Sequence, residues 1–271
     1  MRKTTLPLLA GALLLGASGH LHAQSPETHD NLDAPFVRNL RPDRPGQTVT
    51  TSMLRPGQFQ VEAGTQRLVP GAGLGTTRSL GLLRVGFFNH MELRLAQAYV
   101  HQQPRPTREG APVAAYGLAP LTLGAKWLAS TRQDARSQVV FLTELTLPKT
   151  GDQSLHLAKP LAAARALVSQ QIGRRYGLEA NLGFSQSGFR AADTKQGQFL
   201  YTLALNGPLG KRFGFFAEGY GTGRGSYQYG TTAGLNWRPL PGLRLDVTAG
   251  RTLTGPSSTS FGGGVSVRLP Q

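Results

Sequence analysis

The run Met91-Glu92-Leu93-Arg94-Leu95 decides the fold class, because apolar and charged side chains alternate along it. Successive side chains of a β-strand point to opposite faces, so such a run forms a strand with one apolar and one charged face. The same alternation returns at 59–63, 178–182 and 243–247. These repeats predict an all-β chain whose strands have two unlike faces.

Segments with this alternation, bounded by Gly, Pro, Asn or Asp, fill the chain after residue 56. Strands of about 9–11 residues cross a bilayer at a tilt, and these segments have about that length. The pattern predicts a transmembrane antiparallel up-and-down β-barrel of about 12 strands. We place the strands at 57–68, 78–88, 91–101, 118–129, 137–147, 160–172, 176–187, 197–206, 211–222, 226–238, 242–253 and 258–269.

The connections between these segments alternate in length. Short turns lie at 89–90, 173–176, 206–210 and 238–242, and longer links lie between them at 102–117, 148–159 and 186–196. Short periplasmic turns and longer extracellular loops are typical of outer-membrane barrels with both termini in the periplasm. The connections at 130–136 and 223–225 fit this rule less well.

One segment favours another structure by its local composition. Leu161–Val168 contains four alanines and has the propensity of a helix. An even number of strands and the short turn at Gly173 require a strand there, and we predict one.

Composition and motifs exclude several classes of function. The chain has no Cys, so disulfides, thiolate metal sites and cysteine nucleophiles are absent. No His-Glu-x-x-His or Gly-x-Ser-x-Gly motif occurs, and we expect no enzyme and no metal or cofactor. The net charge is +15, but the arginines are scattered over many connections, so we expect no nucleic-acid partner.

The first residues indicate export. Arg2 and Lys3 precede a short apolar run that ends near a small residue, Ala23, so residues 1–23 are expected to be a signal peptide. Residues 24–56 form a Pro-rich periplasmic leader, either a tether or a plug, and residues 57–271 form the barrel. The expected location is the cell outer membrane.

The two faces of the strands define the candidate site. In lipid the outward face must be apolar, with Leu93, Leu203 and Val247 among its members. The opposite face then lines the lumen. Its candidates are Glu62, Glu92, Arg94, Lys126, Glu144, Glu179, Glu218, Arg238, Arg244, Asp246 and Arg268. A soluble lipocalin-like barrel would have the two faces reversed.

Several segments resemble a known family, the outer-membrane transporters grouped under the MetA pathway of phenol degradation. The similar segments are Pro42–Thr48, Gly57–Gly64, Leu83–Gly86, Glu92–Arg94, Leu121–Lys126, Asn181–Gly183, Glu218–Gly221, Leu245-Asp246 and Phe261–Arg268. The resemblance spans about residues 41–269 and implies a β-barrel with a transport role.

Two functions follow from these observations. The barrel is a passive channel or transporter for small solutes, with aromatic or hydrophobic ones included. Alternatively, it is closed, its inner charges pair with one another, and arginines such as Arg105, Arg108 and Arg190 bind lipid head groups. The expected partners are outer-membrane lipid, a small-molecule solute and the barrel-assembly machinery.

Overall fold

The computed structural model describes residues 40–44, 46–71, 75–102, 115–131, 136–189, 197–224, 226–254 and 257–269. The expected signal peptide and the first part of the leader lie outside this range, as do Arg105, Arg108 and Arg190. Among the described residues, no helix is long and apolar enough to cross a membrane.

The described chain is almost entirely β-structure, with one 3₁₀ turn at Gln153–Leu155. The strands are β1 (Phe59–Pro70), β2 (Thr76–Phe88), β3 (Met91–Gln102), β4 (Ala115–Leu118), β5 (Thr122–Thr131), β6 (Ser137–Thr146), β7 (Leu161–Ile172), β8 (Tyr176–Ser187), β9 (Gln198–Pro208), β10 (Phe213–Arg224), β11 (Ser226–Leu240), β12 (Leu243–Thr252) and β13 (Ser258–Leu269).

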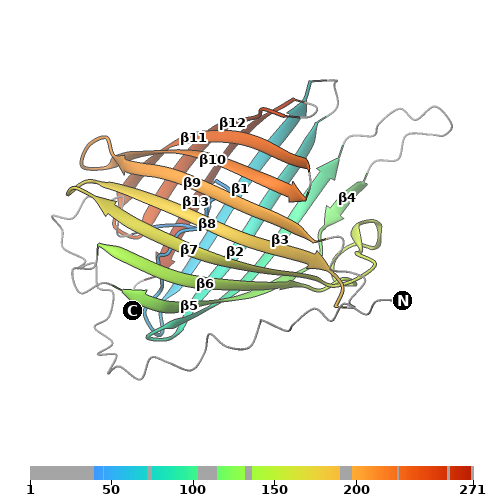
Figure 1. Ribbon diagram of the computed structural model, residues 1–271, viewed down its shortest axis with the longest axis horizontal. Helices are drawn as coiled ribbons and strands as arrows, with labels where there is room; N and C mark the ends of the chain where they lie inside the picture. The colour runs from blue at the N-terminus through green and yellow to red at the C-terminus, as the bar shows by residue number, and fades with distance from the viewer. Residues whose placement is uncertain are drawn as a thin grey trace, which may run out of the picture.

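Twelve of these strands close a barrel (Figure 1). Each strand pairs antiparallel with its neighbours, β1 pairs with β13, and the pairing of β2 with β3 completes the ring. Closure gives each of these twelve strands two neighbours, as a lipid environment requires, whereas the short β4 pairs with β3. The predicted up-and-down barrel of about 12 strands is confirmed.

The short strand β4 is an addition that the sequence did not indicate. The predicted strand 118–129 is broken between β4 and β5, which both pair with β3, at Tyr99↔Leu118 and Ala96↔Thr122. Three residues, 119–121, therefore pass two residues of β3. Pro120 has no N–H to donate to a ladder, which explains a bulge at this point.

The alanine-rich segment forms strand β7, as predicted. It pairs along its length with β6 and with β8. Two complete ladders outweigh the helical propensity of its alanines, which is a weak local preference.

The two ends of the barrel differ. Residues 89–90, 132–136, 173–175, 209–212 and 241–242 connect strands at one end, here called the short-turn end, on the left in Figure 1. The other end, the long-loop end, carries 71–75, 103–121, 147–160, 188–197 and 253–257. One connection at that end is short, since Arg224 and Ser226 pair directly across residue 225.

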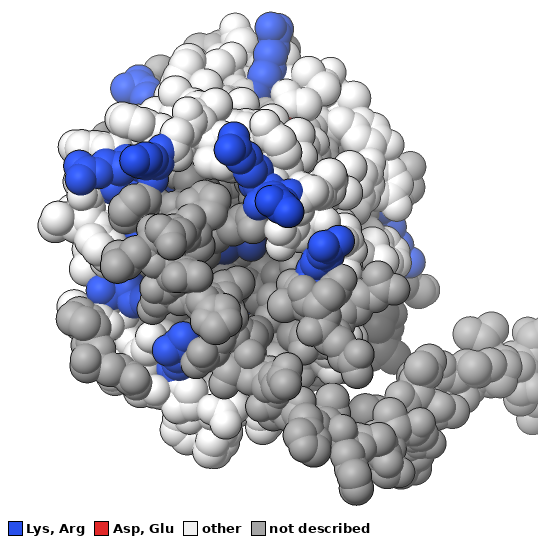
Figure 2. Space-filling view, turned by 90° about the vertical axis from the view of Figure 1, so that its left-hand side faces the viewer, with Lys and Arg blue, Asp and Glu red and all other residues white. Residues whose placement is uncertain are grey.

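The short-turn end is basic. Figure 2 looks onto this end, and the charged side chains visible among the described residues are Lys and Arg, without Asp or Glu. The exposed basic residues of the short turns are Arg136, Arg174, Arg175, Lys211 and Arg212.

Exposed and buried side chains alternate along the strands, with apolar residues outside and charged residues inside, as a membrane barrel requires. Large apolar side chains are exposed on the outer face, with Leu203 at 53% and Val247 at 60%. Charged side chains are buried, and Glu62, Glu92 and Lys126 have no exposed surface. A soluble lipocalin-like barrel has the opposite arrangement, so this pattern belongs to a barrel in lipid.

Candidate functional site: the barrel interior and the leader

The eleven candidate lumen residues share the inner face of the barrel. The strand register places them opposite one another in neighbouring strands, as with Glu92 and Lys126 across β3 and β5. Nine of the eleven are buried, and Glu144 and Arg268 are half-buried. Their charges therefore meet each other and the leader rather than bulk water.

The described part of the leader lies inside the barrel as a re-entrant loop. At the short-turn end, Leu40 accepts a hydrogen bond from Arg244 (3.3 Å), and Gly57 donates one to the carbonyl of Gly86 (2.9 Å). Between these points, Arg44 reaches the middle of β1 and β13, at Gly64 and Gly264. The leader thus enters and leaves at one end, and it fills the short-turn half of the interior.

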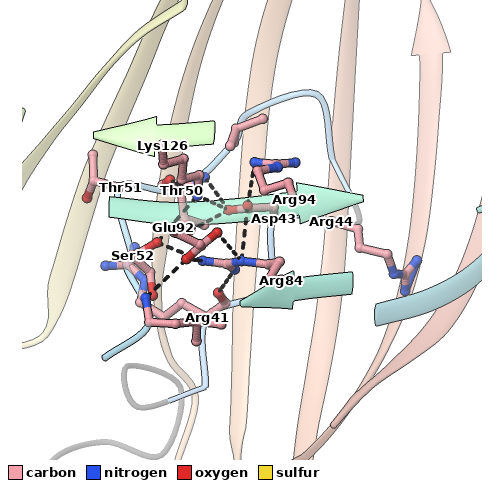
Figure 3. A network of polar contacts seen from close by, with 12 residues as sticks. Arg41, Asp43, Arg44, Thr50, Thr51, Ser52, Arg84, Glu92, Arg94 and Lys126 are labelled. Atoms are coloured by element: carbon pink, nitrogen blue, oxygen red, sulfur yellow. Dashed lines mark hydrogen bonds and ion pairs between the residues drawn. The ribbon is translucent and has the colours of Figure 1, made fainter. Parts of the chain in front are cut away.

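Asp43 of the leader is the centre of a buried ionic network (Figure 3). Its carboxylate accepts hydrogen bonds from Arg94 (2.7 Å), Lys126 (2.7 Å) and the hydroxyl of Thr50 (2.9 Å). Arg84 lies 3.5 Å from the same carboxylate. One leader side chain is therefore held by three cations from three strands.

Arg84 continues the network to two glutamates. It donates two hydrogen bonds to Glu92 (2.7 and 2.8 Å) and one to Glu62 (3.1 Å). It also donates to the leader carbonyls of Arg41 (3.1 Å) and Ser52 (2.7 Å). The network thus combines three carboxylates, of Asp43, Glu62 and Glu92, with three cations, of Arg84, Arg94 and Lys126, and has no net charge.

The environment of Asp43 keeps it ionised. Burial by itself would raise the pKa of this carboxyl, but the charges of Arg84, Lys126 and Arg94 hold the pKa well below its ordinary value. Asp43 therefore remains a charged anchor for the leader at any physiological pH.

On the opposite wall, strands β8 to β12 bind the backbone of the leader. Glu218 accepts hydrogen bonds from the N–H groups of Gln47 (2.8 Å) and Thr48 (2.9 Å). Asn181 accepts from the N–H of Val49 (2.7 Å) and donates to its carbonyl (3.0 Å). A buried segment without secondary structure needs such partners for its polar groups, and the inner face supplies them.

Two ion pairs add to these contacts on the same wall. Arg44 donates to both oxygens of Asp246 (2.8 and 2.9 Å), and Arg41 pairs with Glu179. On this wall four of the predicted lumen residues, Glu179, Glu218, Arg244 and Asp246, thus contact the leader directly.

Apolar contacts complete the packing of the leader. Val49 packs in a buried cluster with Val140, Leu142 and Leu167 of strands β6 and β7, and Met53 packs against this cluster. The interior is therefore apolar where Val140, Leu142 and Leu167 meet the leader, although the same two strands also carry the inner charges Glu144 and Arg165.

Arg238 and Arg268 lie at the short-turn end and bond neutral groups. Arg268 donates two hydrogen bonds to the side-chain oxygen of Gln60 (3.0 and 3.1 Å). Arg238 donates to the carbonyls of Leu240 (3.3 Å) and Pro241. These two arginines bring positive charge to the entrance used by the leader.

A cavity of about 370 Å³ lies beyond the leader, toward the long-loop end. Leader residues such as Arg44 and Gln47 line it on one side. Its wall comes from the long-loop halves of β1 to β3 and β5 to β8, with Arg94, Glu144 and Arg165 among its charged members.

Three central residues were missed in the sequence: Asp43, Arg84 and Arg165. Arg84 and Arg165 each carry a charge within a strand, and charged side chains in membrane strands face the interior, so that signal was available. The signal was hard to recognise because Leu82 and Leu167, on the same inner face, are apolar. Polar and apolar residues therefore do not alternate regularly in these two strands. Nothing in the leader sequence marks Asp43 as the centre of a network.

The described residues contain no group of three or more His, Asp or Glu side chains arranged to hold a metal ion.

Known structures share this architecture. The COG4313 outer membrane channel from Pseudomonas putida F1 is 13% identical, with a TM-score of 0.65 over 83% of this chain and 99% of that chain. The NanC porin is 8% identical, with a TM-score of 0.55 over 77% of this chain and 100% of that one. The KdgM porin in complex with disordered oligogalacturonate is 10% identical, with a TM-score of 0.54 over 77% and 98% of the two chains. At these identities the likeness establishes the fold alone.

No curated protein matches the chain in sequence. The family described as "Putative MetA-pathway of phenol degradation" does match, over residues 42–269. This range begins one residue before Asp43 and ends at the last residue of β13, so it includes both the leader that enters the barrel and the strands that enclose it. The chain belongs to this family of the MetA pathway of phenol degradation.

Proposed function

We propose that this protein is a passive outer-membrane channel for small solutes, with aromatic and hydrophobic compounds among them, and that its leader acts as a plug. The observation that carries the proposal is the filling of the interior: the leader occupies the short-turn half, and a cavity of about 370 Å³ remains in the long-loop half. Family membership and the apolar outer face support it.

The short-turn end is the periplasmic end in this proposal. Its basic turns adjoin exposed apolar side chains, as where Arg174 and Arg175 stand between Ile172 and Tyr176. Arginine forks suit phosphate oxygens, so these turns lie at the level of the lipid head groups when the apolar band is in hydrocarbon. The long-loop end then faces the exterior, and the cavity is an outer vestibule.

In this proposal, the leader controls passage. It crosses the interior between two walls, bound to β2, β3 and β5 through Asp43 and to β8 and β10 through Asn181 and Glu218. A solute that leaves the vestibule must pass beside the leader or displace it.

Liposome swelling tests the channel. Proteoliposomes placed in iso-osmotic solutions of uncharged sugars of increasing size swell at rates that report the entry of each sugar. We expect swelling with the smallest sugars and a steep decline with size. Swelling no faster than in protein-free liposomes, with correctly folded protein, contradicts the channel.

A disulfide staple tests the plug. The hydroxyl oxygens of Thr48 in the leader and Thr202 in β9 are 2.9 Å apart, which suits a pair of cysteines, and the chain has no Cys of its own. We expect the oxidised T48C/T202C double variant to pass less solute than its reduced form. The single variants T48C and T202C are the controls and should not respond to the reductant. Equal flux through the oxidised and reduced double variant contradicts passage by displacement of the leader.

A closed structural barrel is the second candidate, favoured by the neutral and fully buried network around Asp43. Replacing Glu92 and Arg94 together by Gln distinguishes the two. A channel changes its ion preference in planar bilayers, whereas a closed barrel loses stability without gaining conductance.

A further inference from the structure

We propose that the outer vestibule is a binding site for the carboxylate of a small, one-ring aromatic anion, with Arg78 and Arg165 as the residues that recognise its charge. This inference rests on the proposed channel function and names a substrate class for it. It combines four features of the cavity: an excess of cations, incompletely bonded guanidinium groups, an apolar wall and a suitable size.

The cavity has more positive than negative charge. Four arginines line it, Arg44, Arg78, Arg94 and Arg165, against two carboxylates, Asp43 and Glu144. Asp43 is already bonded to Arg94 and Lys126 at 2.7 Å each. Glu144 is left to two arginines at longer distances, 3.7 Å from Arg94 and 3.9 Å from Arg165.

Arg78 adds a cation with no carboxylate of its own. Its position in β2 has the same parity as Leu82 and Arg84, so its side chain belongs to the inner face. Among the described residues, no carboxylate forms an ion pair with it. Arg44 is paired with Asp246, and Arg94 belongs to the neutral network around Asp43. Glu144 therefore faces the two remaining cations, Arg78 and Arg165, which leaves one positive charge in excess.

Guanidinium groups at the cavity also have donors without an acceptor. The Nε atoms of Arg44 and Arg94 are buried and make no hydrogen bond to any described residue. The Arg94 side chain is only 7% exposed. A buried donor without an acceptor costs free energy, so the positive charge of these two guanidinium groups is only partly compensated by hydrogen bonds.

One side of the same cavity is apolar. Leu80, Leu82 and Ala96 on β2 and β3 line it, as do Leu161 and Ala163 on β7. A carboxylate alone gains nothing from this wall, and an uncharged ring forms no ion pair with the arginines. A compound with a ring and a carboxylate uses both, which is why we name this class.

The volume fits one ring. An apolar cavity of about 150 Å³ holds a benzene molecule, and the vestibule measures about 370 Å³. A single-ring carboxylate fits together with some of its hydration water.

Equilibrium dialysis of the detergent-solubilised, full-length protein with benzoate tests the site. Benzyl alcohol, of nearly the same shape but uncharged, is the matched ligand. We expect wild-type protein to retain more benzoate than benzyl alcohol. The variants R78Q and R165Q should each lower the affinity for benzoate about tenfold, in the range of a charge-assisted hydrogen bond, and leave benzyl alcohol unchanged.

R67Q is the matched control. Arg67 is exposed on the outer face of β1 at the same end of the barrel, so the substitution removes the same charge on the other side of the wall. It should bind benzoate as wild type does. The heat-dependent shift of each variant on gels checks that it is folded.

Equal retention of benzoate and benzyl alcohol by wild type overturns the inference, as does undiminished benzoate binding by folded R78Q and R165Q. These outcomes are separate from failure of the channel, which appears as the absence of sugar-driven swelling in wild-type proteoliposomes. If the protein binds benzoate but its proteoliposomes do not swell, the binding site is confirmed and its role in transport is refuted.

Discussion

Arg84 shows how much one buried side chain can organise. It has no exposed surface, bonds Glu62 and Glu92 of the barrel, and bonds two carbonyls of the leader. A guanidinium has five N–H donors in a fixed plane and can satisfy several acceptors at once, which lysine cannot do with the same geometry. Wall and leader are thus joined through one residue.

The first residue-scale prediction is a loss of stability in R84Q. Removing this charge leaves Glu62 and Glu92 buried with too few partners, which costs about 3–5 kcal/mol for a buried ion pair broken on one side. Urea unfolding of the detergent-solubilised barrel should show a correspondingly lower midpoint. R67Q, on the outer face, should unfold within about 0.5 kcal/mol of wild type. A midpoint for R84Q equal to that of R67Q is incompatible with the network as described.

The second prediction at the residue scale concerns how the effect of Asp43 on the channel depends on pH. The pKa of Asp43 is depressed in the folded protein. The contribution of its charge to holding the leader is therefore complete above the ordinary carboxyl pKa of about 3.9. This contribution is lost as the pH falls through the lower pKa of the folded protein. The difference in open probability between D43N and wild-type channels should therefore be constant from pH 7 to about pH 5 and shrink below that range. Single-channel recordings over this series measure it. A difference that disappears near neutral pH contradicts the depressed pKa.

At the scale of elements, a pair of glycines makes room for the leader. Gly64 in β1 and Gly264 in β13 are directly opposite each other in the ladder. A Cβ added at either position would overlap the guanidinium of Arg44. Two neighbouring strands thus lack side chains at the point where Arg44 crosses them to reach Asp246.

The element-scale prediction is that G64A loosens the leader while the barrel remains closed, because the three atoms nearest to a Cβ at Gly64 all belong to the Arg44 guanidinium. The added methyl moves Arg44 from its place beside Asp246 and weakens the leader on that wall. We expect a higher open probability in bilayers, with an unchanged heat shift on gels. G173A serves as the control, since an added Cβ there meets nothing within 4 Å, although its positive φ of 58° adds local strain at the turn. Matching open probabilities for G64A and wild type would show that this contact does not hold the leader.

At the scale of the whole molecule, the apolar outer face and the charged inner face of the barrel together require a lipid environment. Exposed Leu, Phe and Tyr side chains surround an interior of ion pairs. In water this surface would be a very large apolar patch, far beyond what soluble proteins expose. The closed ladder protects the backbone in hydrocarbon, because each of the twelve barrel strands is paired on both sides.

The whole-molecule prediction follows from that closure. The protein should fractionate with outer membranes and run on gels at a different mobility before and after boiling, since a closed barrel resists detergent until it is heated. Recovery in the soluble periplasmic fraction, with no heat shift, contradicts a membrane barrel.

The sequence alone predicted the barrel and the direction of its side chains. Runs such as Met91–Leu95 have a strict period of two, and this period fixes which residues share a face, whatever the fold around them. All eleven candidate lumen residues therefore have the inner parity, and even the alanine-rich β7 could be placed from the even number of strands. Arg84 and Arg165 were missed where apolar residues share the inner face and the period is lost.

Only the tertiary structure determined where the leader lies and what the inner charges bind. Alternation relates residues that are two apart in one strand, but the partners of Asp43 come from β2, β3 and β5, and those of Gln47 and Val49 from β10 and β8. These contacts join residues more than a hundred positions apart in some cases, as with Val49 and Asn181. No local pattern encodes them, because they exist only once closure of the barrel brings opposite walls within reach of one segment.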